Sequence, residues 1–132
     1  RPRLRLPWIG TRDYLLKGFT VVRGRLDIIA EDTFETDPVK MIELFGVAQQ
    51  HELDIHPRAL RLITRSLKKI DAAMRANRQA NRYFLEILTS KKDPETTLRR
   101  MNEAGVLGRF ILDFGRVVAQ MQHDMYHVYT VD

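Results

Sequence analysis

The sequence contains no cysteine among its 132 residues, so it can form neither a disulfide bond nor a thiolate metal site. It also lacks any stretch close to the ~18 uninterrupted apolar residues of a membrane span. Arg12, Asp13 and Lys17 interrupt the region in which a secretory leader would carry its apolar core. From these absences we expect a soluble, cytoplasmic protein without a membrane partner.

Short motifs of nucleotide binding and nucleophilic catalysis are missing as well. The stretches GTRDYLLKG, residues 10–18, and GVLGRF, residues 105–110, lack the glycine spacing and the lysine-hydroxyl pair of a P-loop. No serine nucleophile motif is present. The length suits one domain, which buries roughly two-thirds of the surface that its unfolded chain exposes.

Both ends of the sequence look internal to a longer protein. The chain opens RPRLRLPWIG, and its first methionine is Met41. It closes on MQHDMYHVYTVD, whereas a natural C-terminus usually trails off into polar, poorly packed residues. We therefore expect a segment cut from a larger polypeptide.

The net charge of +5 and the pI near 9.8 invite a nucleic-acid interpretation, but the charges are unevenly distributed. Residues 27–54 contain eight acidic side chains and one basic side chain, Lys40. Residues 58–82 contain eight basic side chains and one acidic side chain, Asp71. Two neighbouring segments of opposite sign can lie against each other and leave little field for a partner. We therefore expect no nucleic-acid partner.

The hydrophobic pattern predicts a mainly α protein, an antiparallel bundle of about five helices with a short N-terminal β-hairpin. FTVVRGRLDII, residues 19–29, is rich in β-branched and apolar residues on both sides of Arg23-Gly24, as a tight hairpin turn requires. The predicted helices cover residues 38–50, 57–74, 79–89, 94–104 and 110–127.

Two of these helices have recognisable start signals. Asp37 and Asp93 are each followed by proline, which suits an N-cap residue with proline at the first helical position. Gly105 is expected to end the second of these helices.

Apolar side chains recur along one face of three predicted helices, and we expect these faces to turn inward. In residues 57–74 the opposite face is basic, and we favour a solvated face over a phosphate-binding ridge. The apolar residues are Leu60, Ile63, Leu67, Ile70 and Met74 in the second helix, Tyr83, Phe84, Ile87 and Leu88 in the third, and Phe110, Phe114, Val117, Val118, Met121, Met125 and Val128 in the last.

His123 and His127 are four residues apart, on the side of the last helix away from its apolar stripe. This spacing occurs in helical zinc sites, but zinc needs three or four protein ligands in all. No cysteine can complete the set, and His51 and His56 are far away in sequence. We therefore predict no metal site within these residues.

Three stretches resemble one known family. The most specific is LRRMNEAGVLGRFILDFGRVVAQMQHDMYHVYTVD, residues 98–132. FLEILTSKKDPETTLRRMN and DPVKMIELFGVAQQHELDIHPRALRLI fit the same pattern, so the resemblance runs from about Gly18. They are similar to the central region of bacterial bifunctional uridylyltransferase/uridylyl-removing enzymes, which modify the nitrogen-regulatory PII protein. Members of that family usually carry a proline where this sequence has Leu112, at the entry to the last predicted helix.

The resemblance implies a place within a larger enzyme. Residues 1–30 would be the tail of a nucleotidyltransferase domain or the join to it, and residues 31–132 a helical domain that ends at the threshold of an HD-type phosphohydrolase domain. The parent would use Mg²⁺ and UTP to uridylylate PII when glutamine is low, and would remove the UMP when glutamine is high. Neither catalytic centre would lie in these 132 residues, and we expect no cofactor in them.

Four arginines within the most specific stretch are the candidates for contact with phosphate or with a neighbouring domain: Arg99, Arg100, Arg109 and Arg116. The alternative is that they make only surface ion pairs. Two other functions also stay open for the chain, a non-catalytic helical module for protein interaction and a basic bundle that binds nucleic acid.

Overall fold

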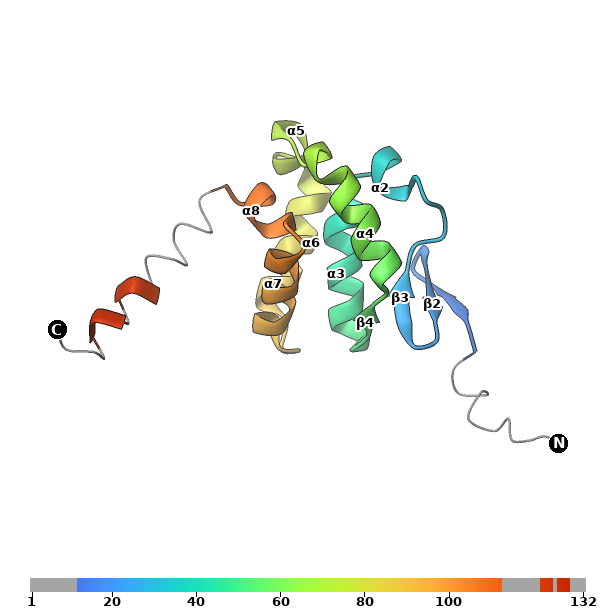
Figure 1. Cartoon of the computed structure of the whole chain (residues 1–132), viewed down its shortest axis with the longest axis horizontal. Coiled ribbons are helices and arrows are strands. Elements are labelled where there is room, and N and C mark those ends of the chain that lie inside the picture. The colour runs from blue at the N-terminus through green and yellow to red at the C-terminus, as the bar shows by residue number, and fades with distance from the viewer. Residues whose placement is uncertain (1–11, 113–121, 125, 129–132) are drawn as a thin grey trace.

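The protein is mainly helical, with a small β-sheet near its N-terminal end (Figure 1). The structure is a computed structural model that describes residues 12–112, 122–124 and 126–128. The predicted mainly α class is confirmed. The finer prediction of five helices with a hairpin needs corrections, because some helices are shorter and the sheet is larger.

The sheet contains four strands in the order β1 (Tyr14–Leu16), β2 (Phe19–Val22), β3 (Arg25–Asp27) and β4 (Asp54–Ile55). The first three are antiparallel neighbours, whereas β4 runs parallel to β3. The predicted hairpin is therefore too small: it contains β2 and β3 but omits β1 and β4. Strands of two or three residues carry too little periodicity to be recognised.

Two tight turns connect the first three strands. Lys17-Gly18 joins β1 to β2, and Arg23-Gly24 joins β2 to β3. The φ angle is positive at all four residues, which defines a type I′ turn whose twist matches that of the flanking strands. The turn predicted at Arg23-Gly24 is thus present.

The buried helix α3 lies at the centre of the fold. It packs against α6 and α7, while α4 packs against α2 and β3 (Figure 1). Phe19, Val21 and Leu26 of the sheet are buried as part of the same core. The helices are α2 (Thr33–Thr36), α3 (Lys40–His51), α4 (Pro57–Ser66), α5 (Ala72–Arg75), α6 (Arg78–Thr89), α7 (Pro94–Glu103) and α8 (Val106–Phe110).

The predicted helix at residues 57–74 is wrong, because the chain breaks it after α4. A 3₁₀ turn, η1 (Leu67–Lys69), follows α4, and the Asp71 carboxylate then accepts a hydrogen bond from Met74 N–H at 3.0 Å to cap α5. A short polar side chain that bonds its neighbouring backbone competes with a continuous helix in this way. Of the predicted stripe, Ile63, Ile70 and Met74 are buried, whereas Leu60 and Leu67 are half-buried.

The two predicted helix starts have different outcomes. At α7, Asp93 accepts from Thr96 N–H at 3.2 Å as the N-cap, with Pro94 at the first position, so this prediction is confirmed. At α3 the prediction is wrong: Asp37 ends the short helix α2, and α3 begins at Lys40 without a side-chain cap.

The Asp93 carboxylate shows the electrostatics of such a cap. Hydrogen bonds from the Thr96 hydroxyl and then from its N–H lower the pKa of Asp93 below its ordinary value. A lowered pKa means that folding favours the ionised form. The stabilisation of α7 by this cap is therefore present above the ordinary pKa and is lost as the pH falls through the lowered one.

The predicted last helix, residues 110–127, is confirmed only in part: residues 122–124 and 126–128 are helical, whereas Ile111 and Leu112 are not. Helix α8 starts at Val106, directly after Gly105, and ends at Phe110, because Ile111 is extended. The Phe110 ring packs edge-on against Phe84 with centroids 5.5 Å apart. Phe114, Val117, Val118, Met121 and Met125 lie outside the described residues, and Val128 is 68% exposed rather than turned inward.

The apolar face predicted for α6 is correct except at Leu88. Phe84 and Ile87 are buried on α6 and Tyr83 is half-buried, whereas Leu88 is 40% exposed.

Within the part of the chain that the structure describes, no helix is both long enough and apolar enough to span a membrane.

The predicted contact between the acidic and basic segments is confirmed at two points. Arg58 Nη1 lies 3.2 Å from Asp27 Oδ2, and Lys69 Nζ lies 3.8 Å from Glu35 Oε1. The first pair is largely buried and the second is exposed. Charge compensation between the two segments is thus local.

The Gly105→Ala variant is expected to lose about 1 to 3 kcal/mol of unfolding free energy. Gly105 has φ +83°, and a Cβ there would lie 2.9 Å from Leu67 Cδ1. Urea denaturation measures the loss. Gly108→Ala is the control, because a Cβ at Gly108 meets nothing within 4 Å and alanine favours the helix by about 0.5 to 1 kcal/mol. Equal stability of the two variants would contradict the prediction.

Candidate functional site

Arg100, one of the four predicted arginines, joins two elements of the fold. Its Nη2 lies 3.0 Å from Asp54 Oδ1, and its Nη1 donates to the Leu53 carbonyl at 3.4 Å. The guanidinium therefore ties the middle of α7 to the start of β4. Its side chain is still 41% exposed, so it also reaches solvent.

The other predicted arginines have separate surroundings. Arg99 pairs with Glu95 at 3.4 Å on the exposed surface of α7, the arrangement expected of a simple surface ion pair. Arg109 is exposed on α8, and its carbonyl accepts from Arg75 Nη1 at 3.2 Å. Arg116 lies outside the described residues. The arginines thus contact different groups.

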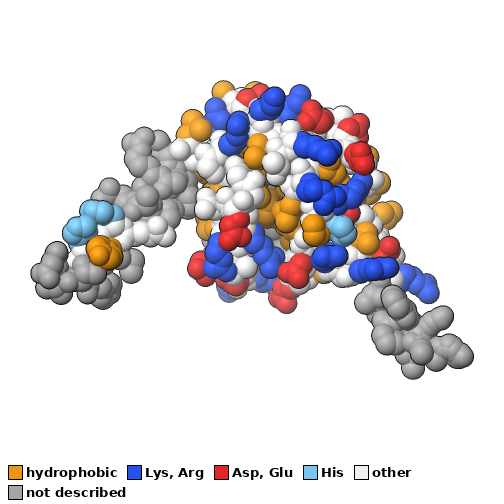
Figure 2. Space-filling view, in the orientation of Figure 1, with side chains coloured by type: hydrophobic (Ala, Val, Ile, Leu, Met, Phe, Trp, Pro, Cys, Tyr) orange, Lys and Arg blue, Asp and Glu red, His pale blue; other side chains and the backbone are white. Residues whose placement is uncertain are grey.

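Arg100 lines a groove between α4 and α7, which we call the α4–α7 groove. Its volume is about 450 Å³. The apolar part consists of Phe45, Ile55, Leu60 and Ala104, and the charged residues at its edge are Arg25, Asp54, Arg100 and Glu103. In Figure 2, hydrophobic side chains are visible in the hollow between these helices, and lysine and arginine side chains lie over α4. An apolar floor with a charged edge suits a peptide or protein segment better than a small polar metabolite.

A buried carboxylate, Asp27, lies at the end of β3 and was not singled out by the sequence pattern. Its Oδ1 accepts from Ile28 N–H at 2.8 Å, and its Oδ2 accepts from Arg58 Nη1 at 3.2 Å. His56 Nδ1 lies 3.9 Å from the same Oδ2 and accepts from Arg58 N–H at 3.0 Å as the N-cap of α4. This cluster attaches the start of α4 to the sheet. Asp27 and Arg58 are 31 residues apart in sequence, so no local sequence signal predicts their contact.

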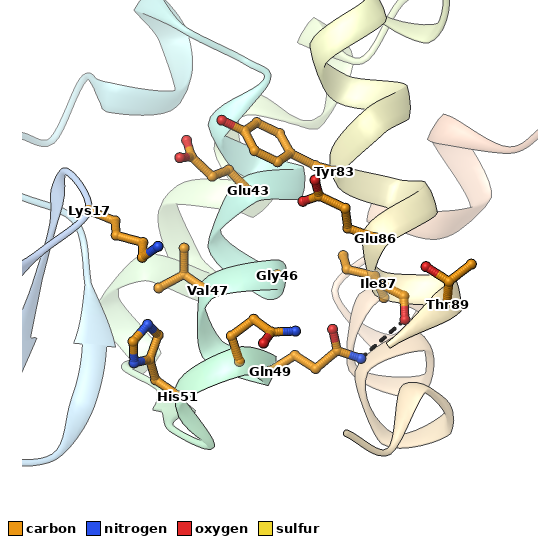
Figure 3. Close-up of a pocket in the computed structure, with 11 residues that line it drawn as sticks. Lys17, Glu43, Gly46, Val47, Gln49, His51, Tyr83, Glu86, Ile87 and Thr89 are labelled. Atoms are coloured by element: carbon orange, nitrogen blue, oxygen red, sulfur yellow. Dashed lines mark hydrogen bonds between the residues drawn. The ribbon is translucent and has the colours of Figure 1, made fainter. Parts of the chain in front are cut away.

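A second groove, between α3 and α6, has a volume of about 480 Å³ (Figure 3). Gln49 Nε2 donates to the Ile87 carbonyl at 3.2 Å and links the two helices. Lys17 and His51 lie on one side of the groove, whereas Glu86 projects from α6. Because both charges occur around it, this groove selects no single class of ligand.

The two histidines near the C-terminal end, His123 and His127, are exposed, as expected for residues outside the core. His127 Nδ1 lies 3.0 Å from the His123 carbonyl oxygen, and His123 Nδ1 lies 3.6 Å from Asp124 Oδ1. Among residues 12–112, 122–124 and 126–128, no three histidine, aspartate or glutamate side chains gather in a way that could hold a metal ion.

Comparison with known families identifies the domain. Residues 19–110 match the family model described as the uridylyltransferase GlnD third domain. The chain belongs to this family. The GlnD third domain therefore includes β2, β3 and all of the elements from α2 to α8. It contains every residue that lines the α4–α7 groove, whereas Lys17 of the α3–α6 groove lies outside it.

Two curated relatives of this GlnD domain carry the same name, bifunctional uridylyltransferase/uridylyl-removing enzyme. The protein from Azospirillum brasilense is 64% identical over 115 residues, which are 87% of this chain. The protein from Novosphingobium aromaticivorans is 60% identical over 114 residues, which are 86% of this chain. The chain spans only 12% of the length of each relative. No solved structure matches it.

Proposed function

We propose that this chain is the helical domain of a bifunctional uridylyltransferase/uridylyl-removing enzyme of the cytoplasm. The observation that carries the proposal is the match of residues 19–110 to the GlnD third domain, together with two relatives of that name at 64% and 60% identity. Because those relatives are far longer, the enzymatic activity is assigned to the whole polypeptide.

The same proposal assigns this chain a place within the longer polypeptide. Residues 1–30 join a preceding nucleotidyltransferase domain, and residues 31–132 form the helical domain up to the threshold of an HD-type domain. The two parts share the sheet, since β3 of the first pairs with β4 of the second. A rigid sheet at the join would fix the orientation of the helices relative to the preceding domain.

The proposed reaction is UMP transfer from UTP to a tyrosine hydroxyl of the PII protein, with release of pyrophosphate, when glutamine is low. When glutamine is high, water releases UMP again. Mg²⁺, when bound by aspartates of the transferase domain, would stabilise charge on the entering and leaving oxygens. The described residues offer no cluster of ligands for such an ion. Their proposed contribution is to close the nucleotide cleft from one side.

Arg100, Arg109 and Arg116 remain the proposed residues for contact with phosphate or a neighbouring domain, whereas the exposed pair of Arg99 with Glu95 favours the alternative of a surface ion pair. Arg100 is the most useful one to test, because it is held by Asp54 and yet is 41% exposed at the edge of a groove. Arg99 suits the role of a control, since Glu95 on its own helix pairs with it.

The experiment compares the full-length enzyme with the 132-residue chain. Each is incubated with PII, UTP and Mg²⁺, and the mass of PII is measured. We expect PII to gain one UMP per modified subunit with the full-length enzyme and to keep its mass with the short chain. UMP transfer by the short chain, or none by the full-length enzyme, would overturn the proposal.

The same assay tests the arginines in the full-length enzyme. Arg100→Ala is expected to raise the KM for UTP or PII about tenfold if it contacts substrate, as the loss of one charged hydrogen bond does. Arg99→Ala is expected to change it less than twofold. Identical kinetics in both variants would leave Arg100 with only its ion pair to Asp54.

A further inference from the structure

We propose that the α4–α7 groove is the docking site of an acidic amphipathic helix from the part of the polypeptide outside these 132 residues. This inference rests on the proposed function in that it takes the chain to be one domain of a longer enzyme. Its support comes from the surface of α4, the floor of the groove and the charges at its edge.

Helix α4 has three surfaces with different chemistry. At about 100° per residue, Leu60 and Thr64 fall on one side and line the groove, while Ile63 faces the core on another. The third side carries a basic row that we define as Arg61, Arg65 and Lys68, the last of these in η1. This basic row lies next to the groove-lining side.

The basic row is not compensated within the domain. All three residues are exposed, and in the described ranges their side chains make no hydrogen bond or ion pair. Arg58 and Lys69, by contrast, pair with Asp27 and Glu35. A row of free cations beside a groove attracts a partner of negative charge.

The floor of the groove offers apolar surface to a partner. Leu60, Ile55 and Ala104 are half-buried, and Phe45 lies buried beneath them. An amphipathic helix binds such a groove through apolar side chains at positions i, i+3 or i+4, and i+7.

The edge of the groove that α7 and β4 form, opposite α4, carries both positive and negative charges. On α7 and β4, Arg100 pairs with Asp54 at 3.0 Å, and Glu103 adds a second carboxylate to that edge. The α4 edge is therefore cationic and the α7 edge is mixed. A helix with apolar anchors and an acidic flank toward α4 satisfies both edges.

The remainder of the same polypeptide is the most economical source of this helix. The chain covers 12% of each relative's length, so most of the protein lies outside the domain. A segment of the same molecule reaches the groove at a high effective concentration, which compensates for a modest affinity.

The test places a photo-crosslinking amino acid at Thr64 of the full-length enzyme. Thr64 is exposed and lines the groove, and its hydroxyl donates to the Leu60 carbonyl at 3.1 Å. Mass spectrometry of the crosslinked peptides is expected to identify a segment outside residues 1–132 with periodic apolar residues and an excess of aspartate and glutamate. The same amino acid at Ala73, which is exposed on α5, should not give that crosslink. Glu103 provides a second insertion point in the groove.

Charge reversal tests the electrostatic part. Arg61→Glu with Arg65→Glu is expected to lower the crosslink yield about fivefold or more, because two attractive charges become repulsive. The matched control, Arg78→Glu with Arg82→Glu, makes the same charge change on α6 and should keep the yield within about twofold.

Several outcomes would overturn the inference. These are a yield at Thr64 and Glu103 no higher than at Ala73, a crosslink to a segment without acidic residues, and a crosslink to a second copy or to nucleic acid. The same preparations are assayed for UMP transfer to PII. A crosslink to an acidic segment without UMP transfer would reject the proposed function and support the docking site. UMP transfer without that crosslink would support the proposed function and reject the docking site.

Discussion

Ile63→Ala is expected to lower the free energy of unfolding by about 2 to 5 kcal/mol. Ile63 lies on α4 and is 0% exposed, so the truncation removes apolar contacts and leaves a cavity in a close-packed core. The surrounding core residues are held by several helices and can collapse only partly into the space. The loss should therefore exceed the transfer free energy of the deleted atoms alone.

Equilibrium urea denaturation of the 132-residue chain measures this loss at constant m-value. Leu60→Ala is the matched control, because Leu60 belongs to the same predicted stripe but is only half-buried at the groove. We expect it to cost about 1 kcal/mol, since part of its surface is already in water. A larger loss at Leu60 than at Ile63 would mean that α4 turns a different face to the core.

Asp27→Ala is expected to cost about 2 to 4 kcal/mol. The Asp27 side chain is 6% exposed and accepts from both Ile28 N–H and Arg58 Nη1. Its removal leaves a buried N–H without its acceptor and a guanidinium, 30% exposed, without its counter-ion. Because that guanidinium still reaches water, the loss should lie below that of a fully buried broken pair.

Asp27→Asn separates the two contributions, because the amide oxygen can still accept from Ile28 N–H while the charge is gone. We expect it to lose about half as much as Asp27→Ala. Glu95→Ala removes an exposed partner of Arg99 in the same way and should change stability by less than about 0.5 kcal/mol. Similar losses for Asp27→Ala and Glu95→Ala would show that burial does not strengthen the Asp27 pair.

The sequence predicts the elements whose signals are local. Helix α7 has its Asp93-Pro94 start and its Gly105 end within a dozen residues, and its observed limits are Pro94–Glu103. The type I′ turn at Arg23-Gly24 is likewise defined by adjacent residues. At residues 57–74 the apolar period suggested one helix, but the competing local signal, the Asp71 cap, decides the structure.

What the sequence cannot predict depends on residues that meet only in the folded chain. The ion-pair partner of Arg100 is Asp54, which is 46 residues away, and the groove that both residues line requires α4, α7 and β4 to be in place. The family resemblance, however, was available from residues 98–132 and from the segments before them, because short stretches of specific sequence need no three-dimensional context. The sequence makes Arg100 a candidate because it lies within that stretch, whereas the groove that it lines appears only in the structure.

The three residues of β1 protect the edge of the sheet. The family match begins at Phe19, so β1 lies just outside it while pairing with β2 along its whole length. A polypeptide that began at Phe19 would leave β2 as an open edge, with unpaired backbone groups between the apolar residues Phe19 and Val21. Open edges of this kind pair with other chains and promote aggregation. Strand β1 thus helps to keep the matched domain soluble. A polypeptide shortened to residues 19–110 would lose this strand.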